Sequence, residues 1–336
     1  MSSRKLDCRH KRRNQINQTE HTFMGGSSEL TDLQVTFLGT GGSIPTPQRG
    51  LSAIAIQRKN ELLLFDCGEG TQRQMIQAGV GFNRKTKVFV THMHGDHVLG
   101  LPGLLQTMSL LGRDKKLEIY GPQGIKEFVE AISQTVRFSL TFPVQVSEIE
   151  AGLVCEEKEY EVYAIQSNHM NPSLAYALSE KLRPGRFHIE KAKELGVAEG
   201  PLWSKLQGGS SVKLPDGRIV EPEMVLGHPR PGRKIVYTGD TGPSENLVKL
   251  AENADMLIHE ATFEDELKER AIEAGHSTPS MAAETAKEAG VKRLVLTHIS
   301  ARYKDANVLL EQAKKIFVNT ELAEDFLRLE LPLSDD

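Results

Sequence analysis

The sequence predicts a mixed α/β domain in which helices cover β-sheets. From Leu33 onward, short apolar runs of strand length alternate with turn residues. Between several of these runs lie longer stretches whose apolar residues recur at helical spacing, so strand–helix units repeat along the chain. With 336 residues, the chain is long enough for one large domain or two modest ones with an ample core.

The expected strands are apolar runs bounded by turn residues, and they dominate the first part of the chain. In order, they are Leu33–Leu38, Ser52–Ile56, Glu61–Phe65, Lys87–Val90, Leu117–Tyr120, Tyr160–Ser167, Leu174–Leu178, Lys234–Tyr237, Met256–His259 and Arg293–Leu296. The expected helices are longer, and the clearest start has Thr278 as a cap and Pro279 in the first turn. In order, they are Glu69–Ala78, His97–Leu111, Gly124–Val136, Ser244–Ala251, Pro279–Ala289 and Asp305–Phe317.

Composition and charge narrow the possible functions. No apolar run approaches the roughly 18–20 residues that span a bilayer, so membrane integration is not expected. The cysteines Cys8, Cys67 and Cys155 form no C-x-x-C pair, which favours a reducing compartment and a metal site built from His and carboxylates. The net charge of −4 gives no general nucleic-acid-binding surface, so any positive surface for RNA must be local.

Residues 1–32 are expected to lie outside the domain at residues 33–336. Basic residues crowd their start, and polar and Gly/Ser residues follow. No apolar segment follows the basic stretch, so it is not a secretory signal. The simplest interpretation is a disordered tail, or a start upstream of a functional Met24; an organelle transit peptide or an RNA-gripping basic arm are the alternatives.

The segment "THMHGDH", Thr91 to His97, predicts a metal site. It follows a strand and precedes an amphipathic helix, and such loops commonly present functional groups. His92 and His94 are two residues apart, which places both imidazoles on one face of an extended backbone. Asp96 and His97 fall at the helix start and can serve a second ion. Four metal-binding side chains in six positions are hard to obtain by accident.

Further ligands are expected at the ends of later strands, because one loop cannot complete two coordination spheres. His169 follows the strand Tyr160–Ser167, Asp240 lies in a Gly-flanked turn after Lys234–Tyr237, and His298 follows Arg293–Leu296. Each of these positions is the end of a hydrophobic strand, as for the first motif. Together they are predicted to form one site.

These motifs resemble those of the tRNase Z (ribonuclease Z) family within the metallo-β-lactamase fold superfamily. The similarity runs from about Leu33 to the C-terminal helix and rests on motifs that appear in order: "FLGTGGSIPTPQRG", "LFDCGEGTQRQ", "THMHGDHVLGLPGLL", "HEATF", "GHSTP" and "THISARY". The resemblance implies a four-layer αββα sandwich with a protruding arm inserted in its second half. It also implies an endoribonuclease that removes 3′ trailers from tRNA precursors.

Carried over to this sequence, the resemblance implies two Zn²⁺ per subunit. The first would be held by His92, His94 and His169, the second by Asp96, His97 and His298, with Asp240 bridging both. A hydroxide activated by the two metals would attack the phosphodiester, leaving a tRNA 3′-hydroxyl and a trailer 5′-phosphate. Because a metal-bound carboxylate is a poor proton acceptor, Asp96 is expected to be a ligand that orients the hydroxide rather than a general base. Manganese or iron would also accept these ligands.

The leaving 3′-oxygen needs a proton, and His276 is the expected donor, with Glu260 holding its imidazole. The alternative is that His276 only precedes the helix that begins at Pro279. A helix N-terminus disfavours a protonated His, so the catalytic role requires Glu260 or a substrate phosphate nearby.

The glycine-rich turn Gly39–Ser43 lacks the ending of a P-loop, so no nucleotide cofactor is expected. In the family, the segment that follows helps to receive the RNA 3′ end, which implies substrate contacts for Ser43, Thr46 and Arg49. Gly50 replaces the family's usual Asn, so the resemblance does not fix how this loop treats substrates ending in CCA. Arg302 is expected to contact a phosphate or stack on a base, with a surface salt bridge as the alternative.

Residues 179–232 are predicted to be an inserted arm, since an αββα core needs no such insertion. The insertion is rich in Gly and Pro and carries a basic run that includes Lys181, Arg183 and Arg186. The resemblance implies that it grips precursor tRNA, with Gly200-Pro201 as the family's Gly-Pro element, in a homodimer. A solvated helical excursion is the alternative.

One rival function is a small-molecule metallohydrolase of the same superfamily, acting on a cyclic phosphodiester or a thioester. It would share all the ligands but needs neither the arm nor the "HEATF" and "GHSTP" elements. A cytoplasmic location is expected, with organelle targeting by the basic N-terminus as an alternative.

Overall fold

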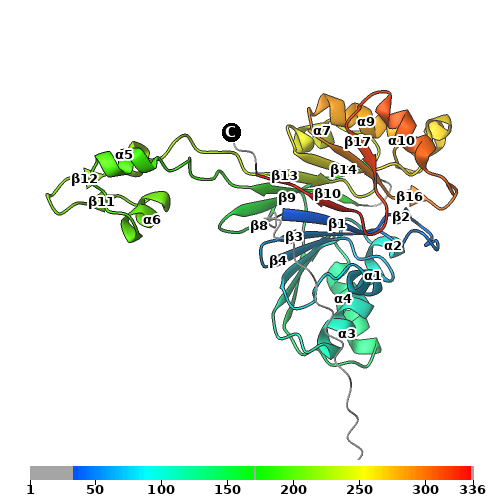
Figure 1. The fold of residues 1–336 in the computed structure, drawn as a ribbon. Coiled ribbons are helices and arrows are strands. Elements are labelled where there is room, and N and C mark those ends of the chain that lie inside the picture. Colours follow the sequence, from blue (N-terminus) through cyan, green and yellow to red (C-terminus); the bar gives the residue numbers. More distant parts are fainter. Residues whose placement is uncertain (1–32, 170–171, 334–336) are drawn as a thin grey trace, which may run out of the picture. The chain divides into compact units, whose positions relative to one another are not determined.

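In a computed structural model, which describes residues 33–169 and 172–333, two seven-stranded sheets face each other between layers of helices (Figure 1). This is the αββα sandwich that the motifs implied. The predicted N-terminal extension, residues 1–32, lies outside the described residues.

The first sheet is built mainly from the N-terminal half of the domain. Its strand order is β18 (Arg328–Glu330), β1 (Leu33–Gly39), β3 (Ala53–Arg58), β4 (Glu61–Phe65), β5 (Lys85–Phe89), β6 (Leu117–Gly121) and β7 (Val144–Glu148). Its outer face is covered by α1 (Thr71–Gln77), α3 (Leu101–Leu110) and α4 (Ile125–Thr135). The strands β4 to β7 are parallel.

The second sheet comes from the rest of the domain. Its order is β17 (Thr320–Leu322), β15 (Leu294–Thr297), β14 (Met256–Glu260), β13 (Lys234–Tyr237), β10 (Leu174–Glu180), β9 (Tyr160–Gln166) and β8 (Gly152–Glu156). Its outer face is covered by α7 (Glu245–Ala251), α9 (Pro279–Glu288) and α10 (Asn307–Lys314). The strands β13, β14, β15 and β17 are parallel.

Strand β4 shows why the sequence carries unbroken apolar runs instead of alternating ones. Leu63 and Phe65 point into the core between the sheets, whereas Leu62 and Leu64 point toward the helices on the outer face. Both faces of such a strand are buried, so both need apolar side chains. Within the central core, the Phe65 ring stacks on Phe89 with centroids 4.9 Å apart.

The insertion between β10 and β13 folds around a small core of its own (Figure 1, green). It contains α5 (Ile189–Glu194), α6 (Pro201–Gln207), β11 (Val212–Lys213), β12 (Ile219–Val220) and a 3₁₀ turn, η1 (Pro222–Met224). The antiparallel pairing of β10 with β13 ends at Ser179–Lys234, and bridges at Arg183–Arg230 and Phe187–Leu226 continue it in the same register. The insertion therefore begins as an extension of these two strands.

Every predicted strand and helix is present, with ends that differ by a few residues. The predicted helix His97–Leu111 is two helices, α2 (Gly95–Val98) and α3, because Gly100 and Pro102 interrupt it. Strands β7, β8, β17 and β18 were not predicted; β7 and β8 carry mixed polar and apolar residues at sheet edges. The other short elements are β2 (Gly41–Gly42), β16 (Ile299–Ser300), η2 (Asp265–Leu267) and α8 (Lys268–Glu273). Within the described part of the chain, no helix has the length and apolar character to cross a membrane.

Candidate metal centre

The loop Thr91–His97 leaves the end of β5 and faces the loops that follow β13, β14 and β15. Parallel strands place their carboxyl ends at one edge of a sheet, and here both sheets contribute such ends to the same region. The Thr91 backbone N–H donates to Asp66 Oδ1 at 2.7 Å, and α2 starts at Gly95. The loop is thereby fixed at its first residue, and its side chains point toward the second sheet.

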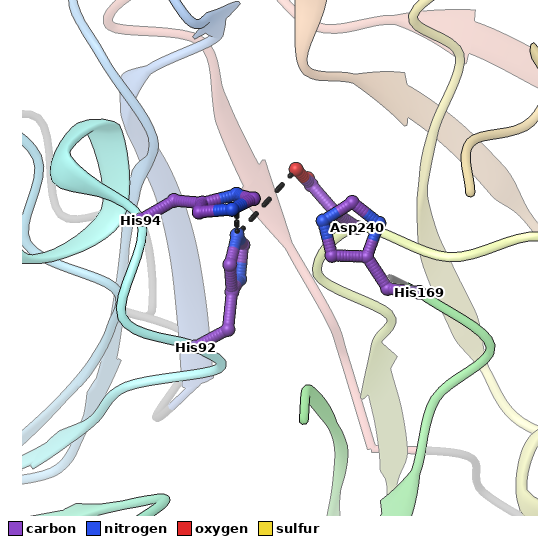
Figure 2. Close-up of side chains that lie close together, drawn as sticks. All are labelled: His92, His94, His169 and Asp240. Carbon is purple, nitrogen blue, oxygen red and sulfur yellow. Dashed lines mark hydrogen bonds and ion pairs between the residues drawn. The ribbon is translucent and has the colours of Figure 1, made fainter. Parts of the chain in front are cut away.

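A first group of four metal-binding side chains is His92, His94, His169 and Asp240 (Figure 2). Their ligand atoms all lie within 4.8 Å of one another. His92 Nε2 is 3.0 Å from His94 Nδ1 and 3.7 Å from Asp240 Oδ2. This spacing leaves room for one shared ion among the four side chains.

A second group is Asp96, His97 and His298, again with ligand atoms within 4.8 Å. His97 Nε2 lies 3.3 Å from His298 Nε2 and 3.6 Å from Asp96 Oδ2. Asp240 lies between the two groups: its Oδ2 faces His92, and its Oδ1 is 3.5 Å from His97 Nε2 and 3.3 Å from His298 Nε2. The structure thus brings the seven predicted ligands together, and His276 lies within the same range of Asp240 and His298.

Four of the imidazoles are oriented through Nδ1, which directs Nε2 to the centre. The Nδ1 partners are Thr91 Oγ1 for His92 at 2.9 Å, Asp66 Oδ2 for His97 at 2.7 Å, the Gly275 carbonyl for His169 at 2.8 Å and Thr262 Oγ1 for His298 at 2.8 Å. Metal-binding histidines in proteins are held in this way, because the second nitrogen sets the tautomer and the ring orientation.

Among the ligand atoms of these two groups, two that are buried have no hydrogen-bond partner within the described part of the chain: His169 Nε2 and Asp240 Oδ1. A buried polar atom without a partner costs free energy, so such atoms need an explanation. Imidazole nitrogens and carboxylate oxygens at this spacing suit a divalent cation such as zinc. The residues present therefore fit a metal cofactor.

The protonation states of His92, Asp96 and Asp240 also suit metal binding. Burial and the nearby His97 lower the pKa of His92 to about 2, so its imidazole is neutral. Burial raises the pKa of Asp96, but its hydrogen bond with His298 and the charge of His97 outweigh burial and hold that pKa well below its usual range. The pKa of Asp240 is lowered in the same way, by His298 and His97. Burial lowers the pKa of His97, but the carboxylates of Asp240 and Asp66 outweigh burial and raise that pKa well above its usual range. Since neutral imidazoles and ionised carboxylates are the forms that bind metals, His97 has to release a proton when a metal binds.

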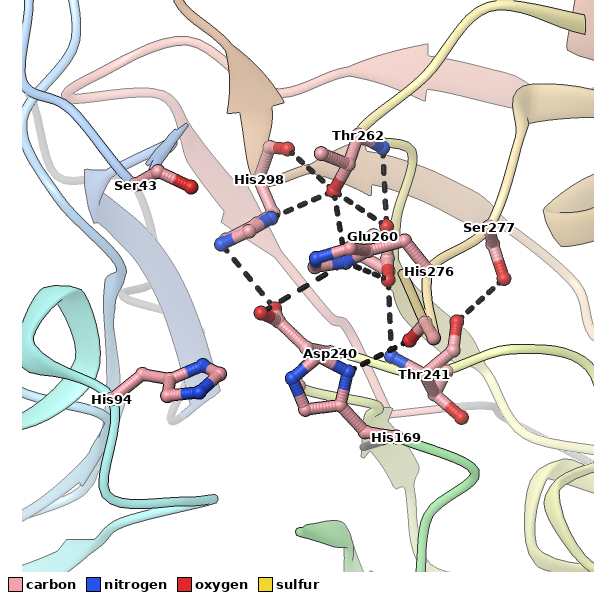
Figure 3. Close-up of polar contacts among 12 residues, drawn as sticks. Ser43, His94, His169, Asp240, Thr241, Glu260, Thr262, His276, Ser277 and His298 are labelled. Carbon is pink, nitrogen blue, oxygen red and sulfur yellow. Dashed lines mark hydrogen bonds and ion pairs between the residues drawn. The ribbon is translucent and has the colours of Figure 1, made fainter. Parts of the chain in front are cut away.

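His276, which is partly buried, pairs with the buried Glu260 beside this centre (Figure 3). His276 Nδ1 lies 2.7 Å from Glu260 Oε1, and the backbone N–H groups of Thr241 and Thr262 donate to the same carboxylate. Burial lowers the pKa of His276, but the carboxylates of Glu260 and Asp240 more than offset it and raise that pKa to about 9. His276 is therefore protonated near neutral pH.

Thr262 connects this pair to the second ligand group. Its hydroxyl donates to Glu260 Oε2 at 2.6 Å and lies 2.8 Å from His298 Nδ1, whose N–H it can accept (Figure 3). The sequence prediction missed Thr262 and Asp66. Asp66 follows strand β4 and carries the same signal as Asp240, an aspartate at the end of a hydrophobic strand, so the same rule could have found it.

The predicted substrate residues lie in two places. The segment Thr40–Gly50, named here the substrate loop, lies beside the centre, and the Ser43 N–H donates to Asp96 Oδ2 at 2.7 Å. Thr46 lies in the same loop, and Arg49 Nη1 donates to Thr40 Oγ1 and to the Ala323 carbonyl, each at 2.6 Å. The Arg49 guanidinium thus links the start of the substrate loop, at Thr40, to the chain segment at Ala323.

Arg302 is exposed, and its guanidinium lies 5.4 Å from the centroid of the Phe263 ring, which in turn lies 5.9 Å from the His276 ring. This places Arg302 on the His276 side of the centre. The predicted arm residues Lys181, Arg183, Arg186, Gly200 and Pro201 belong to the insertion instead. Gly200 precedes α6 with a φ of 115°, and Pro201 is its first residue.

Comparisons with known proteins agree with this geometry. A family model described as anti-Pycsar protein Apyc1 matches residues 33–182, and one described as a beta-lactamase superfamily domain matches residues 223–299. Ribonuclease Z of Methanosarcina acetivorans is 52% identical over 301 residues, which cover 89% of this chain and 98% of that protein. Ribonuclease Z of Methanosarcina mazei is 50% identical over 90% of this chain and 100% of its own length. The crystal structure of human tRNase Z, short form, superposes with a TM-score of 0.67 at 34% identity, covering 89% of this chain and 100% of that one.

Proposed function

Since the chain belongs to the ribonuclease Z family and is a tRNA 3′-processing endoribonuclease with a metal cofactor, we propose how its own residues carry out the cleavage. Two zinc ions would be held, the first by His92, His94 and His169 and the second by Asp96, His97 and His298. The observation that carries this proposal is Asp240, whose two oxygens face the two groups separately. When bound, the ions supply Lewis-acid chemistry: they withdraw charge from phosphodiester oxygens and make water acidic enough to attack near neutral pH.

Asp96 acts as an ionised carboxylate. Its low pKa makes it a poor proton acceptor, and its Oδ2 already accepts a hydrogen bond from the Ser43 N–H. A carboxylate in this position orients the attacking water by accepting a hydrogen bond from it. Asp96 is thus a ligand and an orienting group.

His276 donates the proton that the leaving ribose 3′-oxygen requires. Its Nδ1 is held by Glu260, so Nε2 is the donating atom, and a pKa of about 9 keeps the ring protonated at neutral pH. The buried Glu260 carboxylate, held by two backbone N–H groups, stays in place to stabilise the charged imidazole. Arg302 lies on the His276 side of the centre, and it contacts the mature part of the RNA, which carries the leaving 3′-oxygen.

Two regions outside the centre bind the rest of the substrate. The substrate loop, with Ser43, Thr46 and Arg49, contacts nucleotides at the cleavage site. The basic start of the arm, with Lys181, Arg183 and Arg186, contacts phosphates of the precursor tRNA further away, with Gly200 and Pro201 shaping the arm. A homodimer and a cytoplasmic location stay predictions.

The test uses a precursor tRNA with a 3′ trailer and the metal-loaded protein. Wild type is expected to release the trailer, with a 3′-hydroxyl on the tRNA and a 5′-phosphate on the trailer. Asp96→Ala is expected to abolish cleavage, and deletion of residues 181–225 to weaken it and reduce its salt dependence. Hydrolysis of a cyclic phosphodiester or a thioester, without cleavage of the precursor, would instead establish the small-molecule hydrolase.

A further inference from the structure

The first and last residues of the substrate loop, Thr40 and Gly50, are held together by the carboxylate of Asp325, near the C-terminus. Asp325 Oδ1 accepts hydrogen bonds from the Thr40 N–H at 3.1 Å and the Thr40 hydroxyl at 2.8 Å. Asp325 Oδ2 accepts from the Gly50 N–H at 2.7 Å and from Gln74 Nε2 at 2.7 Å. One side chain therefore joins the first and last residues of the loop, and Arg49 reinforces the closure by bonding Thr40 Oγ1 and the Ala323 carbonyl.

The segment that carries Asp325 is itself fixed to both sheets. The Ala323 N–H donates to the Leu296 carbonyl of β15, and the Phe326 N–H donates to the Phe37 carbonyl of β1. Asp325 lies between these two anchors. The sandwich thus fixes the position of Asp325 through two backbone hydrogen bonds that do not involve the loop.

The other side of the loop lies against the metal centre. The Ser43 N–H donates to Asp96, and a Cβ added to Gly42 would lie 2.5 Å from His298 Cε1. Ser43 has a φ of 62°, a conformation that a non-glycine residue holds only when its surroundings impose it. A change at the base of the loop would therefore displace an exposed tip, Ser43–Gln48, that lies next to the ligands.

Gly50, whose N–H bonds Asp325, has little space for a side chain. A Cβ on residue 50 would lie 3.0 Å from Gln74 Nε2 and 3.3 Å from Asp325 Oδ2, so a side chain there would press on both groups. This is the position at which the sequence has glycine in place of the asparagine that the resemblance leads one to expect. In this chain, the space beside the loop's last residue is occupied by the Gln74 amide and the Asp325 carboxylate.

We infer that Asp325 is a positioning residue that, together with Gly50, sets the substrate loop against the metal centre and thereby fixes where the RNA is cut. This inference rests on the proposed role of the loop in receiving the RNA 3′ end. Asp325 acts through the loop and belongs to neither ligand group.

The test compares Asp325→Asn with wild type on two substrates: a precursor tRNA with a labelled 3′ trailer, and bis(4-nitrophenyl) phosphate, which is too small to need the loop. An amide cannot accept all four hydrogen bonds, so the loop loses part of its closure. The expected result is a fall of about 10- to 100-fold in kcat/KM for the tRNA, mainly in KM, with additional cleavage positions. The kcat/KM for the small diester stays within about 3-fold and the bound metal is unchanged.

Glu324→Gln is the matched control, since it removes a neighbouring exposed carboxylate whose charge also acts on Arg49, without removing any of the four hydrogen bonds that Asp325 accepts. It is expected to cleave the tRNA as wild type does. If Asp325→Asn fails to fold, Gly50→Ala tests the same closure from the other side and is expected to lower tRNA cleavage while sparing the small diester.

Wild-type cleavage by the variants, at one unchanged position, would overturn the inference, as would an equal loss on both substrates. Failure of the wild-type protein to cleave the precursor would overturn the proposed function instead. The inference is tested by the ratio of the variant's kcat/KM to that of wild type, whereas the proposed function is tested by cleavage in wild type itself. The two failures are therefore distinguishable.

Discussion

The Glu260 carboxylate sets the pKa of His276, and this gives a pH prediction. Because a general acid works only when protonated, precursor cleavage should fall as the pH rises through about 9. In Glu260→Gln the pKa of His276 should drop toward its ordinary value of about 6.5, so the alkaline limb of the pH–rate profile should move down by about two units. An alkaline limb at the same pH in both proteins would contradict the role of the pair.

The same shift bears on stability. The folded-state pKa of His276 is raised, so its charged form stabilises the fold fully below about pH 6.5, and this contribution disappears as the pH rises through about 9. Unfolding by denaturant between pH 6 and pH 10 should show this loss in wild type and a much smaller one in His276→Gln. If the free energy of unfolding changed with pH equally in the two proteins, the His276 imidazole would not be charged in the folded state.

Asp66 should matter for metal affinity although it lies outside the centre. It holds His97 Nδ1, the Thr91 N–H and the Tyr237 hydroxyl, each at 2.7 Å. Asp66→Asn should weaken metal binding by about 10- to 100-fold, as for other residues that orient metal ligands. Chelator competition measures this affinity, and Glu69→Gln, an exposed carboxylate nearby, is the control. Unchanged metal affinity in Asp66→Asn would refute the orienting role.

At the level of single residues, the sequence predicted which His and Asp side chains gather at the centre, because each of them follows a hydrophobic strand and lies in a short motif. Thr262 could not be found in this way. A threonine carries no metal-binding signature, and its importance comes from bonding Glu260 and lying next to His298, 36 positions away in the sequence. Contacts of this kind depend on the tertiary fold and leave no local pattern.

At the level of elements, the root of the arm is closed by a buried ion pair. Glu180 and Arg233 are each 4% exposed, and the carboxylate also accepts from Arg58 Nε at 2.8 Å. Removing one partner of such a group leaves a buried charge, so Glu180→Ala should lower the free energy of unfolding by about 3–5 kcal/mol. Chemical denaturation measures this change.

Arg218→Ala is the comparison, since Arg218 pairs with Asp216 at an exposed position of the arm. Its effect on the same unfolding curve should be small. A similar midpoint for Glu180→Ala and wild type would show that the pair contributes little to the fold.

The elements differ in how well the sequence predicted them. Strands buried on both faces, such as β4, were found because they carry an unbroken apolar run, which in β4 is Leu62–Phe65. The edge strands β7 and β8 were missed because their residues are partly exposed and mixed in polarity. Pairing order was not predicted either, since strands adjacent in the sheets are often far apart in the chain, as β1 and β18 are.

At the level of the whole molecule, the metal centre joins the two sheets, because its ligands follow strands of both. Metal removal should therefore abolish cleavage and also lower the melting temperature. Ligand binding at about 1,000 times its Kd stabilises a fold by about 4 kcal/mol, which sets the size of the expected loss. Calorimetry before and after chelation, with zinc added back, measures it; an unchanged melting temperature in a fully stripped protein would contradict the joining role.

The unbroken register between β10 and β13 has a consequence for how such an enzyme could arise. His169 lies before one strand and Asp240 after the other, whereas the arm fills the turn that connects them. A tight turn from Ser179 to Lys234 would restore a plain hairpin and leave both ligands in place. Under the proposed role of the arm in binding tRNA, substrate choice would lie at one end of a hairpin, and the hydrolytic chemistry at the other end could be inherited, or re-engineered, without it.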